Sequence, residues 1–232
     1  APGPITLIGG TVTANANVIA TLADQNILFK SRGGITIAAN KTVQTAGGSA
    51  ATLVLWSGSG GAAGLVLIND GTCLNTQNSC TAATETGGAN IYIGGGSAGT
   101  IYPTGPVTGA SSGISIGTST GTKKIYSGGG DIIMKASVTG GHGIVPAGGS
   151  DIDSGGGAID LQGQTSADGG AGIYLCWYRQ YTNCKITSSK TSGNAIYLKG
   201  VNTSASDSTG GWTTGMMGDN TTSTNSQSVI KS

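Results

Sequence analysis

The chain has 232 residues, of which 44 are glycine and only 9% are charged, and its formal net charge is +1. This balance excludes the basic surface that nucleic acid or an anionic membrane requires, and no apolar run approaches the ~20 residues that span a bilayer. Gly, Thr, Ser and Asn are poor helix formers, so the composition predicts an all-β protein.

Short strands of one pattern recur along the chain. Each begins with a glycine or small polar residue, continues with two apolar residues that flank any one residue, and ends at a polar residue or glycine. Because side chains alternate between the faces of a strand, both apolar residues point to the same side. In chain order the predicted inward pairs are Ile35 and Ile37, Leu53 and Leu55, Leu65 and Leu67, Ile91 and Ile93, Ile114 and Ile116, Ile132 and Met134, Ile159 and Leu161, Ile173 and Leu175, and Ile196 and Leu198.

Two copies of the pattern are nearly identical, SGGGDIIMKA at 127–136 and SGGGAIDLQG at 154–163. A strand that buries two side chains must stack on copies of itself, and the glycines between strands allow sharp corners. The sequence therefore predicts a single-stranded parallel β-helix, a solenoid of roughly nine or ten short coils. The alternative, a β-sandwich, would show longer strands and more hairpin turns than the Asp-Gly pairs at 70–71 and 168–169 provide.

The four cysteines form two close pairs, Cys73 with Cys80 and Cys176 with Cys184. The chain has one histidine, so zinc ligation has little support and local disulfides are favoured. We expect them to close two loop excursions from the rod, the first within residues 69–88, and they indicate an oxidising, extracytoplasmic environment.

The rod itself is predicted to occupy residues 1–200. Residues 201–232 are rich in Ser, Thr and Asn, and form either a last coil with its cap or a polar extension.

The strand pattern resembles that of the filamentous-haemagglutinin-like exoproteins, surface adhesins of Gram-negative bacteria that are secreted through a partner channel. The resemblance rests on NILFKSRGGITI at 26–37, TVQTAGGSAATLVLWS at 42–57 and the two glycine-rich copies, and it covers roughly residues 20–200. It implies a right-handed parallel β-helix, a location outside the cell or on the surface of a Gram-negative bacterium, and a role in adhesion or biofilm. The chain departs from the family in its four cysteines and in its shorter length.

Residues that suggest catalysis or metal binding are few. The stretch GGHGI at 140–144 resembles the Gly-His-Gly element of polygalacturonases, but the aspartate cluster and the Arg-x-Lys element of that family are missing, so His142 is predicted to be a turn residue. Asp151, Asp153 and Asp160 are weak candidates for calcium or for glycoside hydrolysis, and a solvated corner is favoured for them. We therefore expect a non-enzymatic protein without a cofactor.

Aromatic residues supply the candidate contact sites. Five tyrosines directly follow an isoleucine, so an inward isoleucine would turn each tyrosine outward and form an aromatic stripe; these are Tyr92, Tyr102, Tyr126, Tyr174 and Tyr197. The loop CWYRQYTNC concentrates four more candidates, Trp177, Tyr178, Arg179 and Tyr181. Either group stabilises the rod by packing, or it contacts a glycan or a neighbouring subunit.

The sequence thus favours a secreted structural or adhesive β-helix, a segment of an adhesin or of a matrix fibre. Its expected partners are a surface glycan, further copies of itself, or both, and neither nucleic acid binding nor membrane insertion is expected. A self-assembling filament subunit is the first alternative, and a carbohydrate-active β-helix enzyme is the second.

Overall fold

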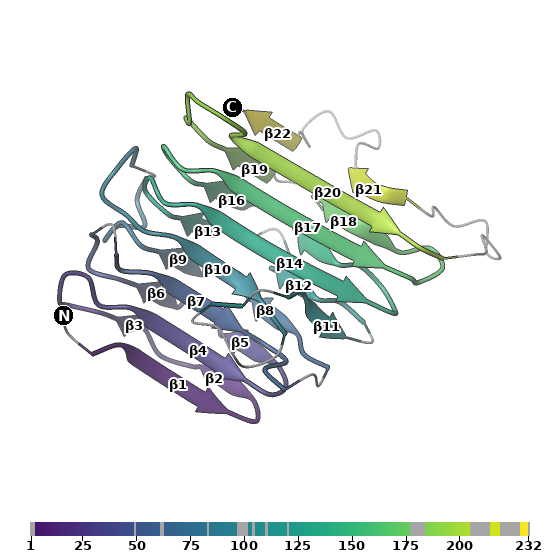
Figure 1. The fold of residues 1–232 in the computed structure, drawn as a ribbon, viewed down its shortest axis with the longest axis horizontal. Helices are drawn as coiled ribbons and strands as arrows, with labels where there is room; N and C mark the ends of the chain where they lie inside the picture. Colours follow the sequence, from purple (N-terminus) through teal and green to yellow (C-terminus); the bar gives the residue numbers. More distant parts are fainter. Residues whose placement is uncertain are drawn as a thin grey trace.

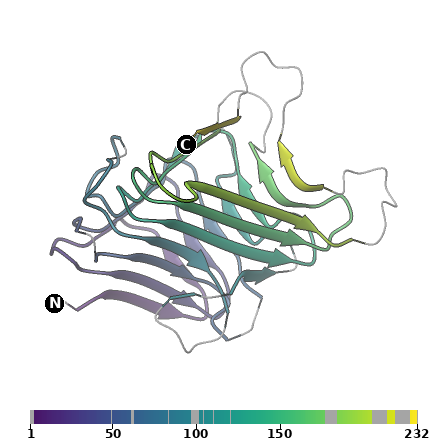
Figure 2. The same cartoon turned by 45° about the horizontal axis from the view of Figure 1, so that its top comes forward.

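The computed structural model describes residues 3–48, 50–60, 63–82, 84–96, 102–103, 105–109, 111–119, 121–176, 184–204, 214–218 and 228–231. Within these residues the secondary structure is all β, and short strands pair in parallel to form three sheets (Figure 1). The coils close around a common interior, and the two termini lie at opposite ends of the stack (Figure 2). The predicted parallel β-helix is confirmed.

Each sheet takes one strand from every coil, listed here from the N-terminal coil onward. Sheet A contains β1 (Ile5–Gly9), β4 (Ile27–Ser31), β7 (Leu53–Trp56), β10 (Ile91–Gly94), β14 (Ile132–Val138), β17 (Ile159–Thr165) and β20 (Ile196–Asn202), and β11 (Val107–Gly109) pairs with β14. Sheet B contains β2 (Val12–Ala14), β5 (Ile35–Ile37), β8 (Val66–Ile68), β12 (Ile114–Ile116), β15 (Ile144–Pro146), β18 (Ala171–Leu175) and β21 (Thr214–Gly218). Sheet C contains β3 (Val18–Ile19), β6 (Thr42–Gln44), β9 (Cys73–Asn75), β13 (Lys123–Tyr126), β16 (Ser150–Asp153), β19 (Cys184–Thr187) and β22 (Ser228–Lys231).

The described strands define seven coils, fewer than the nine or ten that the sequence predicts. Ile132 lies opposite Ile159 on the next coil, 27 residues later (159 − 132). The two coils directly before are longer, because 38 residues (91 − 53) separate Leu53 from its partner Ile91 and 41 (132 − 91) separate Ile91 from Ile132. Excursions from the rod take up the additional residues. The polar segment after residue 200 contributes β21 and β22 to the seventh coil.

The core consists of columns of like residues that stack from coil to coil. The predicted inward isoleucines are confirmed: each is at most 1% exposed in the interior coils, namely Ile91, Ile114, Ile132, Ile159 and Ile173. Ile196 packs against the same core but is only partly buried, because it belongs to the last coil. Burial of apolar surface contributes about 25 cal/mol per Å² to stability. This contribution stabilises strands that would not persist alone.

One predicted register is wrong. Leu65 and Leu67 are expected to point inward, but the structure buries Val66 and Ile68 completely. Four consecutive apolar residues, LVLI, leave either register open to the sequence pattern. Pairing decides between them, since Val66 lies opposite Ile35 on the coil before and opposite Ile114 on the coil after.

Buried hydroxyl groups line the corners that follow β9, β13, β16 and β19 of sheet C, and they belong to Thr76, Ser127, Ser154 and Ser188. The Thr76 hydroxyl donates to the Ala89 carbonyl at 2.6 Å, and the Ser154 hydroxyl donates to the Gly157 carbonyl at 2.7 Å. A buried carbonyl without a partner is costly, so these hydroxyls stabilise the sharp corner from inside. The serine that opens each SGGG copy therefore has a structural function.

Candidate functional site

The first excursion is shorter than predicted. The sequence predicts that residues 69–88 leave the rod, but β9 lies within this range and pairs with β6 and β13 of sheet C. The part outside the sheets, called the disulfide excursion below, comprises residues 76–88. The strand pattern missed β9 because Leu74 is the only residue of that strand that joins the apolar core.

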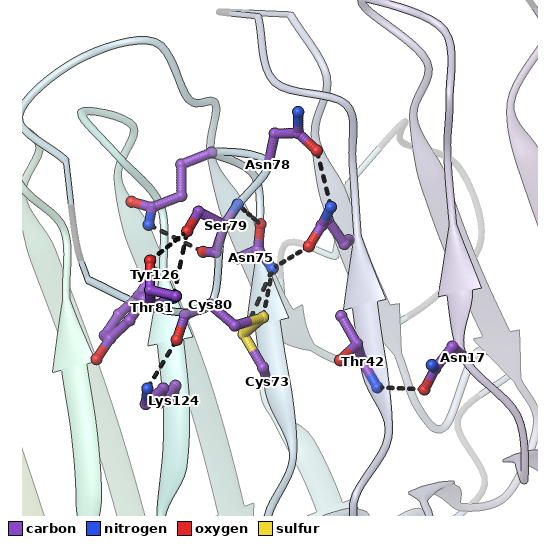
Figure 3. Close-up of a disulfide and its surroundings, with 12 residues drawn as sticks. Asn17, Thr42, Cys73, Asn75, Asn78, Ser79, Cys80, Thr81, Lys124 and Tyr126 are labelled. Atoms are coloured by element: carbon purple, nitrogen blue, oxygen red, sulfur yellow. Dashed lines mark hydrogen bonds between the residues drawn. A yellow bond between two sulfur atoms is a disulfide. The ribbon is translucent and has the colours of Figure 1, made fainter.

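The disulfide excursion is attached to the outer face of sheet C (Figure 3). Cys73 on β9 is bonded to Cys80 in the excursion, as predicted. On the preceding coil, Gln44 Nε2 donates to Asn78 Oδ1 at 2.8 Å, and on the following coil Lys124 Nζ donates to the Cys80 carbonyl at 2.7 Å. The excursion is therefore connected to the coils on both sides of its own.

The two glycine-rich copies of the sequence form the surface on which the disulfide excursion lies. A Cβ atom on Gly155 would lie 2.0 Å from the Thr84 carbonyl oxygen, and one on Gly129 would lie 2.8 Å from the Glu85 carbonyl oxygen. The Gly156 N–H donates to that same Glu85 oxygen at 3.0 Å. The repeated glycines thus permit close approach of a second layer of backbone as well as sharp corners.

A second excursion, which the sequence analysis missed, interrupts sheet A between β10 and β11. Gly95 and Gly105 pair across its base in an antiparallel bridge. Tyr102 stacks on Tyr92 with 4.5 Å between ring centroids, and Trp56 Nε1 donates to the Gly96 carbonyl at 3.1 Å. Tyr102 therefore belongs to an excursion and not to a strand of the rod, and Trp56 is covered although it points outward.

The other tyrosines face outward as predicted, but they do not form one stripe. Tyr92 and Tyr197 project from sheet A, Tyr174 from sheet B and Tyr126 from sheet C. Tyr197 is 43% exposed, whereas Tyr126 is only 3% exposed. A stripe would require tyrosines at the same strand position of one sheet, and the sequence alone did not assign strands to sheets.

The three aspartates named as calcium candidates do not converge. Asp151 and Asp153 lie on the outer face of sheet C, whereas Asp160 lies on the outer face of sheet A. The Tyr126 hydroxyl donates to Asp151 Oδ2 at 2.7 Å, and the Thr187 hydroxyl donates to Asp153 Oδ2 at 2.6 Å. Burial and the Asp151 carboxylate together raise the pKa of Tyr126. Among the described residues, no three His, Cys, Asp or Glu side chains are placed to hold a metal ion.

His142 of the Gly-His-Gly stretch occupies the corner between β14 and β15. The Ala171 N–H donates to His142 Nδ1 at 2.9 Å, and the imidazole meets the Tyr174 ring edge-on with 4.9 Å between centroids. Burial lowers the pKa of His142. These contacts agree with the predicted turn residue, and they serve the packing of neighbouring coils.

The second disulfide joins Cys176 to Cys184, as predicted, and both residues are buried at the corner between sheets B and C. The four candidates in the loop that it closes, Trp177, Tyr178, Arg179 and Tyr181, lie outside the described residues.

A shallow groove lies on the outer face of sheet A. Its volume is about 300 Å³, and it runs over β14, β17 and β20 between two rows of outward side chains. One row contains Lys135, Gln162 and Lys199, which lie opposite one another on consecutive coils. Pro106, at the end of the second excursion, closes the groove on one side. This surface, called the sheet A groove below, was not found from the sequence.

Comparison of the chain with protein-family models, curated proteins and solved structures finds no match. The described part of the chain contains no helix that is long and apolar enough to cross a bilayer.

Proposed function

We propose that this chain is a secreted structural and adhesive segment, part of an adhesin or of an extracellular matrix fibre on a Gram-negative bacterium. The observation that carries the proposal is the in-register stacking of seven coils, which builds a continuous rod with three outer faces. Outward side chains on such faces repeat at the ~4.8 Å spacing of the strands, so they form rows that suit extended or repetitive partners.

The cysteines support the proposed location. All four form disulfides, and the bonded cysteines are 7 and 8 residues apart in the sequence. Disulfides of this kind persist in oxidising compartments and are rare in the cytosol. A small closed loop also stabilises the protein by restricting its unfolded chain, by roughly 2 to 3 kcal/mol in the chain-entropy model.

The adhesive role is tested with beads that carry the folded chain. We expect these beads to adhere to surfaces coated with cell-surface polysaccharide, and beads that carry the reduced and unfolded chain to lose this adhesion. Equal adhesion by both preparations would contradict the proposal, because the contact would not need the rod. Release of new reducing ends from the polysaccharide would instead favour the alternative function, a carbohydrate-active β-helix enzyme.

A self-assembling filament subunit is the second candidate, and the two ends of the rod favour it. Leu7 on the first coil is 38% exposed, and Met216 and Ile230 on the last coil are 46% and 50% exposed, although all three stand in columns that are buried in the interior coils. The terminal strands also leave one edge without a partner strand in the described residues. An open strand edge beside apolar side chains suits the addition of another coil.

Filament formation is tested by electron microscopy and sedimentation over a range of protein concentrations. Assembly end to end predicts filaments that shorten when Leu7→Asp and Ile230→Asp are introduced together. Isolated rods at every concentration would rule out the filament subunit and leave the adhesive segment.

A further inference from the structure

The sheet A groove has the chemistry of a binding site for an anionic chain. Lys135 and Lys199 lie in one outward row, two coils apart, so their Cα atoms are separated by about 9.5 Å along the rod. Neither lysine forms an ion pair with any other described residue. The one ion pair among the described residues joins Lys123 to Asp70. Two ammonium groups thus face one groove, and no described carboxylate is ion-paired with them.

Neutral hydrogen-bonding groups fill the space between and beside these lysines. Gln162 lies between them in the row, and Ser137 and Gln164 line the opposite side. The Gln162 amide N–H donates to both Asp160 carboxylate oxygens at 3.0 Å, which holds its carbonyl oxygen available as an acceptor. These two hydrogen bonds also occupy the carboxylate of Asp160, which lies two positions before Gln162 on the same face of β17.

We propose that the sheet A groove binds an acidic polysaccharide whose sugar carboxylates pair with Lys135 and Lys199, a proposal that rests on the adhesive function above. The glycan chain lies along the rod, across β14, β17 and β20. Its hydroxyls exchange hydrogen bonds with Ser137 and the two glutamines, and its carboxylates recur with a spacing close to that of the lysines. Tyr197, the most exposed of the described tyrosines, stands on the same face of β20 two residues before Lys199 and offers a ring for sugar stacking.

Two lysines on the outer face of sheet C show how the groove differs from another pair of outward lysines. Lys124 and Lys185 on sheet C are also two coils apart in one row, but Asp151 stands directly between them. Lys124 is further engaged by the Cys80 carbonyl. An anionic chain on this row would meet a carboxylate at its centre, so sheet C lacks the charge complementarity of sheet A.

An acidic glycan suits this groove better than a nucleic acid or a peptide does. Nucleic acids are held by many phosphate contacts, whereas the described lining of the groove offers two cationic side chains, Lys135 and Lys199. A peptide would gain most by adding a strand to a sheet edge, whereas the groove is lined by outward side chains on the face of β14, β17 and β20 and not by the open backbone edge of β20.

Isothermal titration calorimetry on the full chain tests the proposal with three probes. These are an oligogalacturonate of defined length, the same oligomer with its carboxylates methyl-esterified, and a single-stranded oligonucleotide of equal charge. The groove variant is Lys135→Gln with Lys199→Gln. The matched control, Lys124→Gln with Lys185→Gln, removes the same charge at the same spacing from sheet C, and thermal unfolding verifies that both variants fold.

We expect the affinity for the oligogalacturonate to be at least about tenfold higher than the affinity for its ester, because charge-assisted hydrogen bonds are stronger than neutral ones. The groove variant should lose about tenfold or more in affinity, the control should change less than about twofold, and added salt should weaken binding. Equal losses in both variants, equal binding of the ester, or tighter binding of the oligonucleotide would each overturn the proposal.

The same variants separate this proposal from the adhesive function on which it rests. If beads carrying the groove variant adhere as well as the original beads, the groove assignment fails and the adhesive function stands. If the oligogalacturonate binds in the groove but no beads adhere to polysaccharide surfaces, the site stands and the adhesive function fails.

Discussion

Lys123 Nζ lies 3.1 Å from Asp70 Oδ1, and the lysine side chain is fully buried while a quarter of the aspartate side chain is exposed. The ammonium also donates to the Ser119 carbonyl at 2.8 Å and to the Gly148 carbonyl at 2.5 Å. Burial lowers the pKa of Lys123, and Asp70 opposes this effect. Burial by itself raises the pKa of Asp70, but the Ser119 hydroxyl and the lysine together lower it below its usual value.

Substitution of Asp70 and substitution of Lys123 should therefore reduce the free energy of unfolding by different amounts. Asp70→Asn leaves a buried ammonium without its counter-charge, and we expect a loss of about 3 to 5 kcal/mol in the free energy of unfolding. Lys123→Met keeps most of the buried stem and leaves a carboxylate that water can reach, but it removes the donor from the Ser119 and Gly148 carbonyls, so a loss of about 1 to 3 kcal/mol is expected. Denaturant unfolding measures both, and a larger loss for Lys123→Met would contradict this account of the corner.

The sequence pattern predicted two of the three sheets. All nine predicted strands fall in sheets A and B, where most strands bury two apolar residues. The five interior strands of sheet C bury one such core residue each, for example Val43, Leu74 and Ile125. A single apolar residue carries no periodicity, so the pattern could not predict the third strand of each coil. For the same reason it could not predict the number of residues in a coil.

Surfaces were harder to predict than the core. Inward positions follow from local alternation, whereas the sheet A groove depends on which strands are neighbours in space, and Lys135 and Lys199 are 64 residues apart (199 − 135). The glycine-rich copies were recognised as corners, but their second role needed the position of the disulfide excursion. Cysteine spacing, by contrast, was sufficient to predict both disulfides.

The alternation of faces along β14 gives a paired test of the core. Ile132 is fully buried, and its neighbour Ile133 points outward from sheet A. Ile132→Asn removes an apolar side chain and places an amide between coils without a partner, so we expect a loss of about 4 kcal/mol or more. Ile133→Asn should cost about 1 kcal/mol or less. Circular dichroism on heating measures both, and similar losses would show that the register is wrong.

Gly155 tests whether the disulfide excursion requires the repeated glycines. Both Gly155 and Gly169 have a positive φ, 58° and 69°, so alanine strains the backbone at either site by about 1 kcal/mol. A Cβ on Gly169 would meet no atom within 4 Å, whereas one on Gly155 would collide with the Thr84 carbonyl. Gly155→Ala should therefore cost about 1 to 3 kcal/mol more than Gly169→Ala.

Local measurements on these glycine variants add a second criterion. Displacement of the excursion should increase amide hydrogen exchange at residues 84–88 in Gly155→Ala and leave it unchanged in Gly169→Ala. Equal stability and equal exchange in the two variants would mean that the excursion does not rest on the glycine corner.

His142 should make the stability of the rod dependent on pH. Its Nδ1 atom accepts the Ala171 N–H, and burial lowers its pKa from the usual value of 6.5, so the folded protein favours the neutral imidazole. The unfolded chain binds the proton more readily, which means that stability is complete above about pH 6.5 and falls as the pH drops through the lowered pKa. Unfolding measured between pH 8 and pH 5 should show this loss, and His142→Gln should flatten it, because His142 is the only histidine in the chain. An unchanged slope in that variant would assign the pH dependence to other groups.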